Sequence, residues 1–405
     1  MNIAIFTNNY LPNPYGVTVS VETFREELEK RGHTVYIFAP KWKDYVDTNP
    51  RVFRYPSIDI EFKFRFPLAI PYSWRMRRIL KNLKIDVIHS QHPNLLGSAG
   101  RRFAKKKKIP LVFTWHTLYD HYTNFVPLIP KKWAADYITQ KAVAYANNAD
   151  VVIAPTASII PILRKWGVKK EIIPIATGIK AEKFVGADRE GIRKKLAIAP
   201  DEIVLFLVSR LTGEKNIEFV FRALKNILAD CPLGKEGSGQ SAGCVKLLVT
   251  GEGYLLPKLK KYCVKEKITE SVIFTGFISP EEIKNYFAAS DIFVHSSKSE
   301  TQGIVPLEAM YMGLPVVAVD STGISSLMLN KANGFLVGED EKEFSGAVLK
   351  LIKDADLRKR FGEASGKIAR ENFTSEVSAD KLLKVYESAI DDRKKIGAKL
   401  RSSGA

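Results

Sequence analysis

Cysteine is scarce in this sequence: Cys231, Cys244 and Cys263 are the three among 405 residues. They have neither the spacing of a metal site nor the even number of a disulfide framework. We therefore expect three thiols in a reducing compartment, and the sequence excludes a small disulfide-stapled secreted domain.

Long apolar runs are lacking as well. No stretch of 18 apolar residues occurs, and the opening Met-Asn-Ile-Ala-Ile-Phe-Thr has no basic segment before its short apolar run. The sequence thus predicts neither a transmembrane helix nor a cleaved signal peptide. At 405 residues, 45% of them apolar and 26% charged, the chain is expected to form two globular domains.

Acidic residues are few in the first half of the chain. Residues 1–180 contain 28 Lys and Arg against 13 Asp and Glu, whereas residues 181–405 contain 34 against 31. Between Phe62 and Tyr119 there are 13 basic residues and a single acid, Asp86. This imbalance predicts a polyanionic partner, anionic lipid or nucleic acid, with a merely solvated basic face as the alternative. No DNA- or RNA-binding motif is present, so we expect no nucleic acid.

Short β-rich runs alternate with helical patterns along the whole chain, which is typical of βαβ units. Strands are predicted at 3–7, 34–39, 86–89, 111–115, 151–154, 172–175, 203–208, 245–250, 272–275, 292–295, 316–318 and 334–337. Residues 180–200 are charged and irregular and are interpreted as a linker. We expect an α/β fold with a first domain at 1–185, a second at 186–374, and a C-terminal helix at 375–405 that returns to the first domain.

The segment from Ser299 to Pro315 carries the clearest chemical pattern. It follows a predicted strand, Pro306 suits the first position of a short helix, and the N-terminal amides of that helix favour a phosphate or sugar hydroxyl beside Gly303. Glu300 in the loop and Glu308 in the first helical turn are expected to accept hydrogen bonds from a vicinal diol. The alternative is that Glu308 only favours the helix dipole and Glu300 is solvated.

Two glutamates separated by seven residues in this context resemble the GT4-type retaining glycosyltransferases. Further segments are similar to that family's motifs: Ser209-Arg210-Leu211 with Glu214-Lys215-Asn216, Gly251-Glu252-Gly253, Phe274 to Ile278, and Pro14-Tyr15-Gly16. Ser209 and Tyr15 depart from it, because glycine is usual at both positions. These segments occur in the family's order over nearly the whole chain.

The resemblance implies a GT-B fold, in which two Rossmann-like doubly wound domains face a central crevice. It implies that Arg210 and Lys215 bind the donor diphosphate, that Glu308 binds the ribose, and that Glu300 binds the transferred hexose. The donor-binding residues so implied are Gly16, Arg210, Lys215, Gly251, Glu252, Phe277, Ile278, Glu300, Gly303, Ile304, Val305 and Glu308. The catalytic residues are His116, Glu300, Arg210 and Lys215, with His116 contacting the sugar.

We expect no metal and no cofactor. Asp354-Ala-Asp356 has the spacing of a metal-binding carboxylate pair, but it lies in an amphipathic helical pattern from Leu351 to Phe361. His89 and His92 have no third ligand nearby and are interpreted as strand-end residues near the acceptor. Members of the GT-B group generally need no metal.

The acceptor is predicted from the basic first half. Residues 62–81 interleave aromatic, aliphatic and basic side chains, as in segments that lie in a lipid interface, and residues 101–108 add a second basic cluster. The expected acceptor and membrane residues are Trp74, Arg75, Arg77, Arg78, Arg101, Arg102, Lys105, Lys106, Lys107, Lys108, Tyr119 and Tyr122. Residues 71–122 resemble the diacylglycerol glucosyltransferase branch of the family and, less closely, its phosphatidylinositol mannosyltransferase branch.

We therefore expect a cytoplasmic, peripherally membrane-associated enzyme that moves a hexose, such as glucose from UDP-glucose, to a lipid such as diacylglycerol. Alternatives are a soluble or phosphoinositide acceptor with mannosyl transfer from GDP-mannose, a sugar-nucleotide epimerase, and a non-catalytic membrane-binding protein. A NAD-dependent dehydrogenase is disfavoured, because one glycine follows the first strand and not G-x-G-x-x-G.

Overall fold

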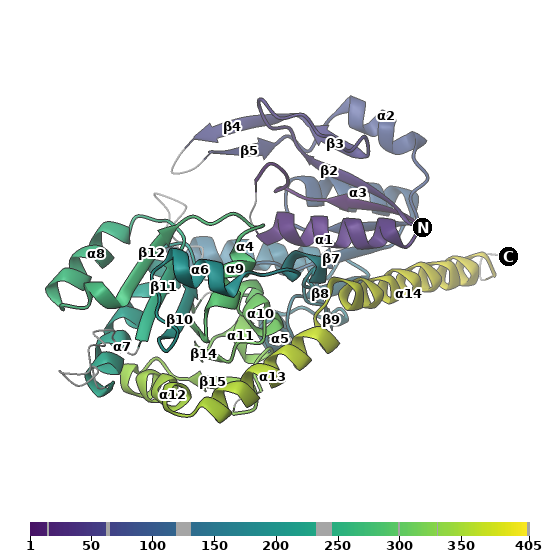
Figure 1. The fold of residues 1–405 in the computed structure, drawn as a ribbon. Helices are drawn as coiled ribbons and strands as arrows, with labels where there is room; N and C mark the ends of the chain where they lie inside the picture. Colours follow the sequence, from purple (N-terminus) through teal and green to yellow (C-terminus); the bar gives the residue numbers. More distant parts are fainter. Residues whose placement is uncertain are drawn as a thin grey trace, which may run out of the picture. The chain divides into compact units, whose positions relative to one another are not determined.

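Alternating strands and helices build two parallel sheets, one in each of two units of the chain (Figure 1). The computed structural model describes residues 1–13, 16–61, 65–118, 131–231, 245–298, 300–329 and 331–402. Unit 1 comprises Met1–Gly178 with Ser375–Ala405, and unit 2 comprises Ile179–Thr374. The predicted α/β class with two doubly wound sheets is confirmed.

Unit 1 contains a seven-stranded sheet in the order β3-β2-β1-β6-β7-β8-β9, with every pair parallel. The strands are β1 (Asn2–Phe6), β2 (Thr34–Pro40), β3 (Val52–Tyr55), β6 (Val87–Ser90), β7 (Leu111–Thr114), β8 (Val151–Ala154) and β9 (Ile172–Pro174). Every residue of β6, β7 and β8 is buried, as expected for a sheet covered on both faces. The strand order reverses at β1, so the adjacent ends of β1 and β6 form a switch point, where such sheets bind ligands.

Helices cover the two faces of this sheet with separate apolar cores. One face is covered by α2 (Trp74–Asn82), α3 (Leu96–Lys107), α4 (Lys131–Ala146) and α5 (Ile160–Trp166), and the other by α1 (Gly16–Lys30) and α14 (Ser375–Ser402). Leu382, Val385 and Tyr386 of α14 share a core with Val21 and Leu28 of α1. The C-terminal helix is therefore a structural part of unit 1. A hairpin of β4 (Ser57–Glu61) and β5 (Arg65–Ala69) precedes α2.

Unit 2 contains a six-stranded parallel sheet in the order β12-β11-β10-β13-β14-β15. Its strands are β10 (Ile203–Val208), β11 (Val245–Thr250), β12 (Val272–Gly276), β13 (Ile292–His295), β14 (Val316–Val319) and β15 (Gly334–Val337). Its helices are α6 (Arg189–Lys195), α7 (Ile217–Asp230), α8 (Leu256–Lys265), α9 (Ile283–Ala289), α10 (Ile304–Tyr311), α11 (Thr322–Ser325), α12 (Glu341–Lys353) and α13 (Ala355–Asn372), with 3-10 turns η4 (Ala181–Phe184) and η5 (Gly213–Lys215). The switch point here lies between β10 and β13.

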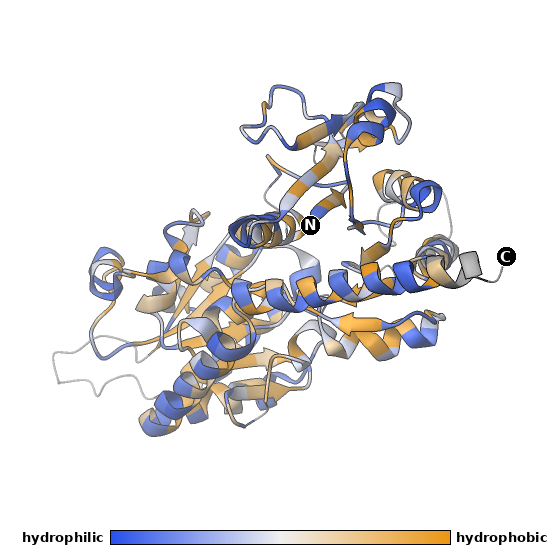
Figure 2. Cartoon of the chain, turned by 90° about the vertical axis from the view of Figure 1, so that its right-hand side faces the viewer, coloured by the Kyte–Doolittle hydropathy of each residue, from blue (hydrophilic) through white to orange (hydrophobic). Residues whose placement is uncertain are grey.

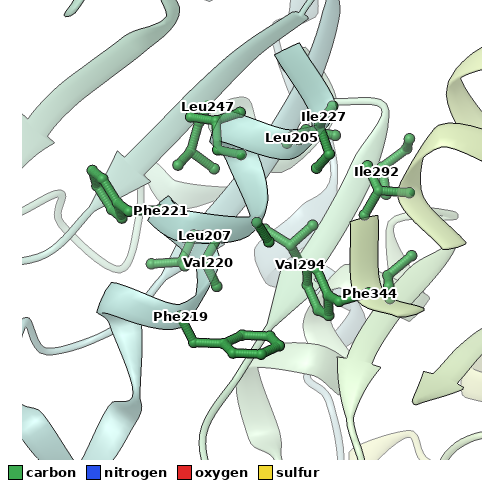
Figure 3. Packing of buried hydrophobic residues seen from close by; sticks show 14 of the residues in the cluster. Leu205, Leu207, Phe219, Val220, Phe221, Ile227, Leu247, Ile292, Val294 and Phe344 are labelled. Atoms are coloured by element: carbon green, nitrogen blue, oxygen red, sulfur yellow. The ribbon is translucent and has the colours of Figure 1, made fainter. Parts of the chain in front are cut away.

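Apolar side chains from α7, α12 and the strands fill one core of unit 2 (Figure 3). Phe219 of α7 meets Phe344 of α12 edge to face, with ring centroids 5.3 Å apart. Hydropathy colouring shows the same division throughout the chain, with largely apolar strands and helices that mix polar and apolar residues (Figure 2). The strand ends that carry the candidate site are thus held by a rigid, two-faced core.

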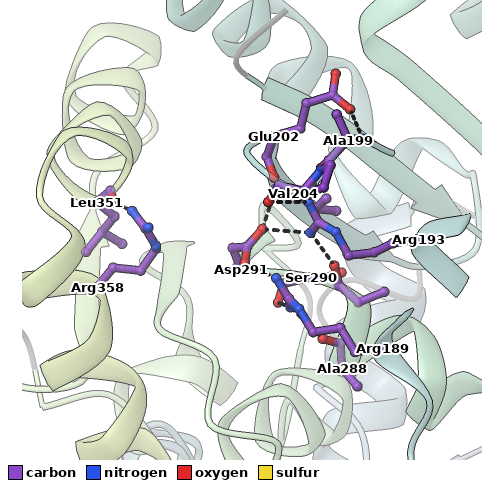
Figure 4. A network of polar contacts seen from close by, with 12 residues as sticks. Arg189, Arg193, Ala199, Glu202, Val204, Ala288, Ser290, Asp291, Leu351 and Arg358 are labelled. Atoms are coloured by element: carbon purple, nitrogen blue, oxygen red, sulfur yellow. Dashed lines mark hydrogen bonds and ion pairs between the residues drawn. The ribbon is translucent and has the colours of Figure 1, made fainter. Parts of the chain in front are cut away.

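The expected linker at 180–200 is wrong, as is the expected domain boundary at 185. Unit 2 begins at Ile179, whose N–H donates to the Phe373 carbonyl at 2.8 Å, and η4 and α6 lie within the supposed linker. Arg193, 4% exposed, donates to the carbonyls of Ala199 (2.6 Å) and Glu202 (2.7 Å) and pairs with Asp291 at 3.4 Å (Figure 4). The charged residues of this segment, which were interpreted as part of a linker, therefore hold α6 against the start of β13.

Asp354 ends the helical pattern that was expected to continue from Leu351 to Phe361. Its backbone is extended, and its carboxylate accepts the N–H of Leu357 at 2.8 Å as the N-cap of α13. A capped helix start needs a side-chain acceptor, which explains this aspartate without a metal.

The expectation of three free thiols is wrong, as Cys231 shows. Cys231 takes part in a disulfide, and its partner lies outside the described residues. Cys263 is a free thiol, buried in α8.

Candidate active site

The two chemical motifs of unit 2 lie at the ends of neighbouring strands. Ser209 to Lys215 follows β10, and Glu300 to Glu308 follows β13, which pairs with β10. Because parallel strands end at the same edge, residues about 90 positions apart meet at the switch point.

Lys215 and Glu300 form an ion pair across that switch point. Lys215 Nζ donates to Glu300 Oε1 at 2.5 Å, and both side chains are mostly buried, with exposed fractions of 16% and 23%. Burial acts to raise the pKa of Glu300, but the charge and hydrogen bond of Lys215 outweigh it and hold that pKa below its ordinary value. Glu300 is therefore an ionised carboxylate with a cation beside it.

His295, the last residue of β13, lies close enough to this pair to interact with it electrostatically, and it was not singled out in the sequence. Burial lowers the pKa of His295 to about 4, so the ring is neutral. Its Nε2 atom is buried and has no hydrogen-bond partner among the described residues. A polar residue ending an otherwise apolar strand was the signal that could have revealed it.

Helix α10 presents uncapped amides at its start. Gly303 is the N-cap with φ of +69°, and no side chain caps the helix. This left-handed φ favours glycine, and a Cβ at this position would also lie 2.7 Å from Ile324 Cδ1. Free N–H groups at a helix N-terminus bind anions and hydroxyl oxygens, and here Ile304 and Val305 begin the helix.

The expected position of Glu308 in the first helical turn is wrong. Helix α10 begins at Ile304, two residues before Pro306, so Glu308 is its fifth residue, and no acid lies in the first turn. Favouring the helix dipole is therefore not an adequate account of Glu308.

Glu308 is a part-buried carboxyl without a hydrogen bond or ion pair among the described residues. Burial raises its pKa to about 7, and the nearby Lys183 of η4 offsets only part of that rise. A carboxyl so placed gains by accepting hydrogen bonds from a ligand diol.

The remaining donor-side residues occupy the ends of β11 and β12, next along the same sheet edge. Gly251 has φ of +126°, and a Cβ there would lie 1.9 Å from the Ser209 carbonyl oxygen. The two loops therefore pack backbone to backbone, and Leu211 N–H donates to the Glu252 carbonyl at 2.8 Å. Phe277 is 69% exposed at the end of β12, followed by the half-buried Ile278.

Arg210 and Tyr254 complete this edge. The Arg210 side chain is 60% exposed and lies 3.4 Å from Glu214, so it is free to turn toward an anion. Tyr254, another residue not singled out in the sequence, accepts the Gly213 N–H on its hydroxyl at 2.8 Å while 70% of it is exposed. This hydrogen bond helps to hold the loop that contains Arg210 and Lys215.

Unit 1 gathers polar groups at its own switch point. His116 follows β7, and its Nε2 lies 2.6 Å from Gln91 Oε1, at the end of β6. His92 Nδ1 accepts the N–H of Asn8, which follows β1, at 3.1 Å. The His92 and His116 ring centroids are 6.5 Å apart. Gly16, the other predicted residue here, begins α1 and is exposed.

Comparison with known proteins assigns the chain to a family. Residues 14–183 match the model "Glycosyltransferase Family 4", and residues 188–368 match "Glycosyl transferases group 1". An alpha-monoglucosyldiacylglycerol synthase of Streptococcus pneumoniae is 33% identical over 93% of this chain and 84% of its own length. The chain belongs to glycosyltransferase family 4. The predicted family and hexosyltransferase activity are confirmed.

Two further comparisons are with a more distant relative and with a solved structure. A GDP-mannose-dependent alpha-mannosyltransferase of Mycobacterium tuberculosis is 27% identical, covering 96% of this glycosyltransferase and 97% of the relative. The Anabaena protein HepE, solved with UDP and glucose, matches with a TM-score of 0.73 at 18% identity, covering 96% of this chain and 100% of that one. The latter likeness supports the GT-B fold.

The glycosyltransferase carries its predicted membrane residues on α2 and α3. Met76 and Leu80 of α2 share a core with Ala99 and Ala104 of α3, and Arg102 reaches the Pro71 carbonyl at 2.9 Å. The outward side chains of the two helices form what we term the basic surface: Trp74, Arg75, Arg77, Arg78, Lys81, Arg101, Arg102, Lys105, Lys106, Lys107 and Lys108. Tyr119 and Tyr122 lie outside the described residues.

No cation of the basic surface pairs with an acidic side chain within the described part of the chain. Arg77 instead lies over the Trp74 ring at 5.3 Å and Arg102 over Tyr72 at 4.5 Å. Trp74 is 84% exposed. The surface therefore combines unneutralised charge with exposed aromatic rings.

In the described ranges, no helix is long and apolar enough to cross a membrane. The same residues contain no group of three His, Cys, Asp or Glu side chains placed to hold a metal ion.

Proposed function

We propose that this glycosyltransferase moves a hexose from a nucleotide-sugar to a lipid alcohol such as diacylglycerol. The arrangement of Arg210, Lys215, Glu300 and Glu308 on the adjacent ends of β10 and β13 carries the proposal. It offers cations for a diphosphate and two carboxylates for sugar hydroxyls in one place. The Streptococcus relative, named for monoglucosyldiacylglycerol synthesis, supports the lipid acceptor.

In the proposed reaction, the bond between the sugar C1 and the diphosphate oxygen breaks, and a bond from C1 to the acceptor oxygen forms. Negative charge develops on the leaving nucleoside diphosphate, where Lys215 and Arg210 stabilise it. The proton of the acceptor hydroxyl passes to the departing phosphate on the same face of the sugar, so the anomeric configuration is retained.

The carboxylates divide the remaining contacts of the donor. Glu300, ionised beside Lys215, accepts hydrogen bonds from hexose hydroxyls, and the free amides at the start of α10 assist it. Glu308 accepts from the ribose. His116 of unit 1 contacts a hydroxyl of the reacting sugar or acceptor.

The basic surface of unit 1 is the proposed membrane contact. A cation close to an anionic leaflet contributes about 1 kcal/mol, and exposed tryptophan favours the interface. The arginines and lysines of the basic surface, with Trp74, supply both features. We place the enzyme peripherally on the cytoplasmic leaflet, where nucleotide-sugars are available.

Transfer is proposed to need no metal, because Lys215 and Arg210 supply the positive charge at the diphosphate. Adding EDTA should leave the initial rate of transfer unchanged within about twofold. A rate that falls with EDTA and returns with Mg²⁺ or Mn²⁺ would contradict this assignment.

The deciding experiment incubates the protein with vesicles of phosphatidylglycerol and diacylglycerol and a panel of UDP- and GDP-hexoses. A hexosyldiacylglycerol from one donor is the expected product. A second candidate is mannosyl transfer from GDP-mannose, supported by the Mycobacterium relative. Parallel vesicles containing phosphatidylinositol test it. Transfer only to soluble alcohols would overturn the lipid assignment, and conversion of the donor without any acceptor would indicate an epimerase.

A further inference from the structure

Two neighbouring imidazoles in unit 1 have protonation sites that their partners determine. The Asn8 backbone N–H can only donate, so His92 Nδ1 must accept and the His92 proton lies on Nε2. On His116 the partner is an amide oxygen, Gln91 Oε1, which can only accept. Its Nε2 must therefore carry the proton, and Nδ1 is left with a bare lone pair.

Gln91 is well placed to act on His116. It is 4% exposed, and its backbone N–H donates to the Phe6 carbonyl at 2.9 Å, which continues the β1–β6 ladder past the end of the strands. The backbone around Gln91 is also held by Ser90, whose hydroxyl donates to the His92 carbonyl at 2.8 Å. The Gln91 side chain thus leaves a rigid strand end and has little freedom to turn away.

The two remaining ring nitrogens are available to a ligand. His92 Nε2 and His116 Nδ1 make no hydrogen bond among the described residues, and neither belongs to the fully buried atoms that lack a partner. His92 Nε2–H is a donor and His116 Nδ1 is an acceptor. Together they match the oxygen lone pair and the O–H of one alcohol. Burial lowers the pKa of His92 to about 4 and that of His116 to about 3, with His92 and His89 as the titratable groups acting on His116.

We propose that Gln91 is a positioning residue that holds His116 in the Nε2–H tautomer, so that His116 Nδ1 and His92 Nε2–H together bind one hydroxyl group of a substrate. This rests on the proposed function, because it takes the hydroxyl to belong to the hexose or to the acceptor alcohol. Both sources share the same chemistry.

The tautomer is measured directly on the full chain labelled with [15N]histidine. The protein has six histidines, and His116→Asn identifies the signals of His116. Imidazole 15N shifts should show a protonated Nε2 and a bare Nδ1 in the wild type, and Gln91→Leu should shift His116 toward a mixture of tautomers. A protonated Nδ1 in the wild type would overturn the proposal, since the amide of Gln91 would then donate. This readout does not depend on which reaction the enzyme catalyses.

Turnover tests the consequence for the substrate. Gln91→Leu should lower kcat roughly tenfold or more, as expected when a group in the reacting site loses its orientation. Gln91→Glu keeps an acceptor beside Nε2 but raises the pKa of His116, so its activity should recover as pH rises and fall at acid pH where the wild type is unaffected. An elevated KM for the donor identifies the hexose as the source of the hydroxyl, and an elevated KM for the lipid identifies the acceptor.

Gln140, exposed on α4, gives the matched control. Gln140→Leu and Gln140→Glu should leave kcat and its pH profile unchanged. If Gln91 variants that fold transfer hexose as the wild type does, the positioning role is refuted. If the wild type transfers hexose to no acceptor, the proposed function fails, while the tautomer result stands separately.

Discussion

Glu300 has a cation within 2.5 Å before any substrate arrives. Replacing it by glutamine keeps the shape but removes the charge that would orient the hexose. We expect Glu300→Gln to lower transfer by roughly 100-fold or more, because a charged contact at the reacting sugar is lost. The Kd for the nucleoside diphosphate, measured by calorimetry, should change by less than about threefold, since Lys215 stays free to bind phosphate.

Glu266→Gln is the control for that change. Glu266 pairs with Lys225 on the surface at 2.6 Å, away from the strand ends of the site. The Glu266→Gln variant should leave both the rate of transfer and the affinity for the nucleoside diphosphate unchanged. Loss of nucleotide binding in Glu300→Gln would assign Glu300 to the nucleotide instead of the sugar.

Glu308 makes donor binding depend on pH. Burial raises its pKa to about 7, so half of the carboxyls are protonated at neutral pH and accept hydrogen bonds poorly. Affinity for the intact nucleotide-sugar should therefore rise as pH increases from 6 to 8 and level off above, because the ligand hydroxyls favour the ionised form. The nucleotide-sugar is the right ligand, since its diphosphate diester does not titrate in this range.

Glu308→Gln should remove that pH dependence and weaken donor binding roughly tenfold, as loss of a hydrogen bond to a charged group does. Glu214→Gln, whose exposed carboxylate lies in the loop beside Arg210, should keep the dependence. A wild-type affinity that is flat from pH 6 to 8 would contradict the carboxylate role.

Sequence patterns predicted the main charged residues of the site better than they predicted the neighbouring residues that act on them. The spacing of Glu300 and Glu308 and the motif around Arg210 were readable, because each follows a predicted strand. His295 and Gln91 were passed over, since a single polar residue at a strand end has no pattern of its own. Their importance depends on neighbours 80 or 25 positions away, which only the fold brings together.

At the level of elements, α2 carries cations that no acid in the described part of the chain neutralises. Reversing Arg75, Arg78 and Lys81 to glutamate should abolish sedimentation with phosphatidylglycerol vesicles, because three attractive charges become repulsive. Met76 and Leu80, which hold α2 to the core, are untouched, so the free energy of unfolding should stay nearly constant. Transfer to lipid in vesicles should fall in parallel with binding.

The matched control reverses the exposed Lys353, Lys359 and Arg360 of unit 2, which changes the net charge equally. Vesicle binding should persist in that variant. If both variants lose binding alike, the effect is one of net charge and the basic surface has no special role.

All strands of the two parallel sheets except β3 were predictable from the sequence to within a residue or two, because strands of parallel sheets are continuous apolar runs. The hairpin β4–β5 was missed, since Asp59, Arg65 and the aromatic residues between them give no clear alternation. Residues 180–200 were misjudged for a related reason. Their charges are matched by backbone carbonyls and by Asp291, and sequence patterns do not contain such distant partners.

On the scale of the whole molecule, the chain builds unit 1 from both of its ends. Helix α14 covers one face of the seven-stranded sheet with Leu382, Val385 and Tyr386, and the Tyr386 hydroxyl lies 2.6 Å from His89 Nδ1. Arg393 pairs with Asp150 at 2.7 Å. Unit 1 is therefore built from two separate stretches of the chain, whereas unit 2 is one continuous stretch.

Separate fragments should reveal this asymmetry. Residues 179–374 contain both cores of unit 2 and its strand-end residues, so this fragment should unfold cooperatively and bind the nucleoside diphosphate nearly as the full chain does, without transferring hexose. Residues 1–178 alone expose the apolar face that α14 covers, and should bind a hydrophobic dye and lack a cooperative transition. The control joins 178 to 375 by a short Gly-Ser linker, which is feasible because Ile179 pairs with Thr374. That chain should regain a cooperative transition, and a stable, dye-free 1–178 fragment would show that α14 is dispensable.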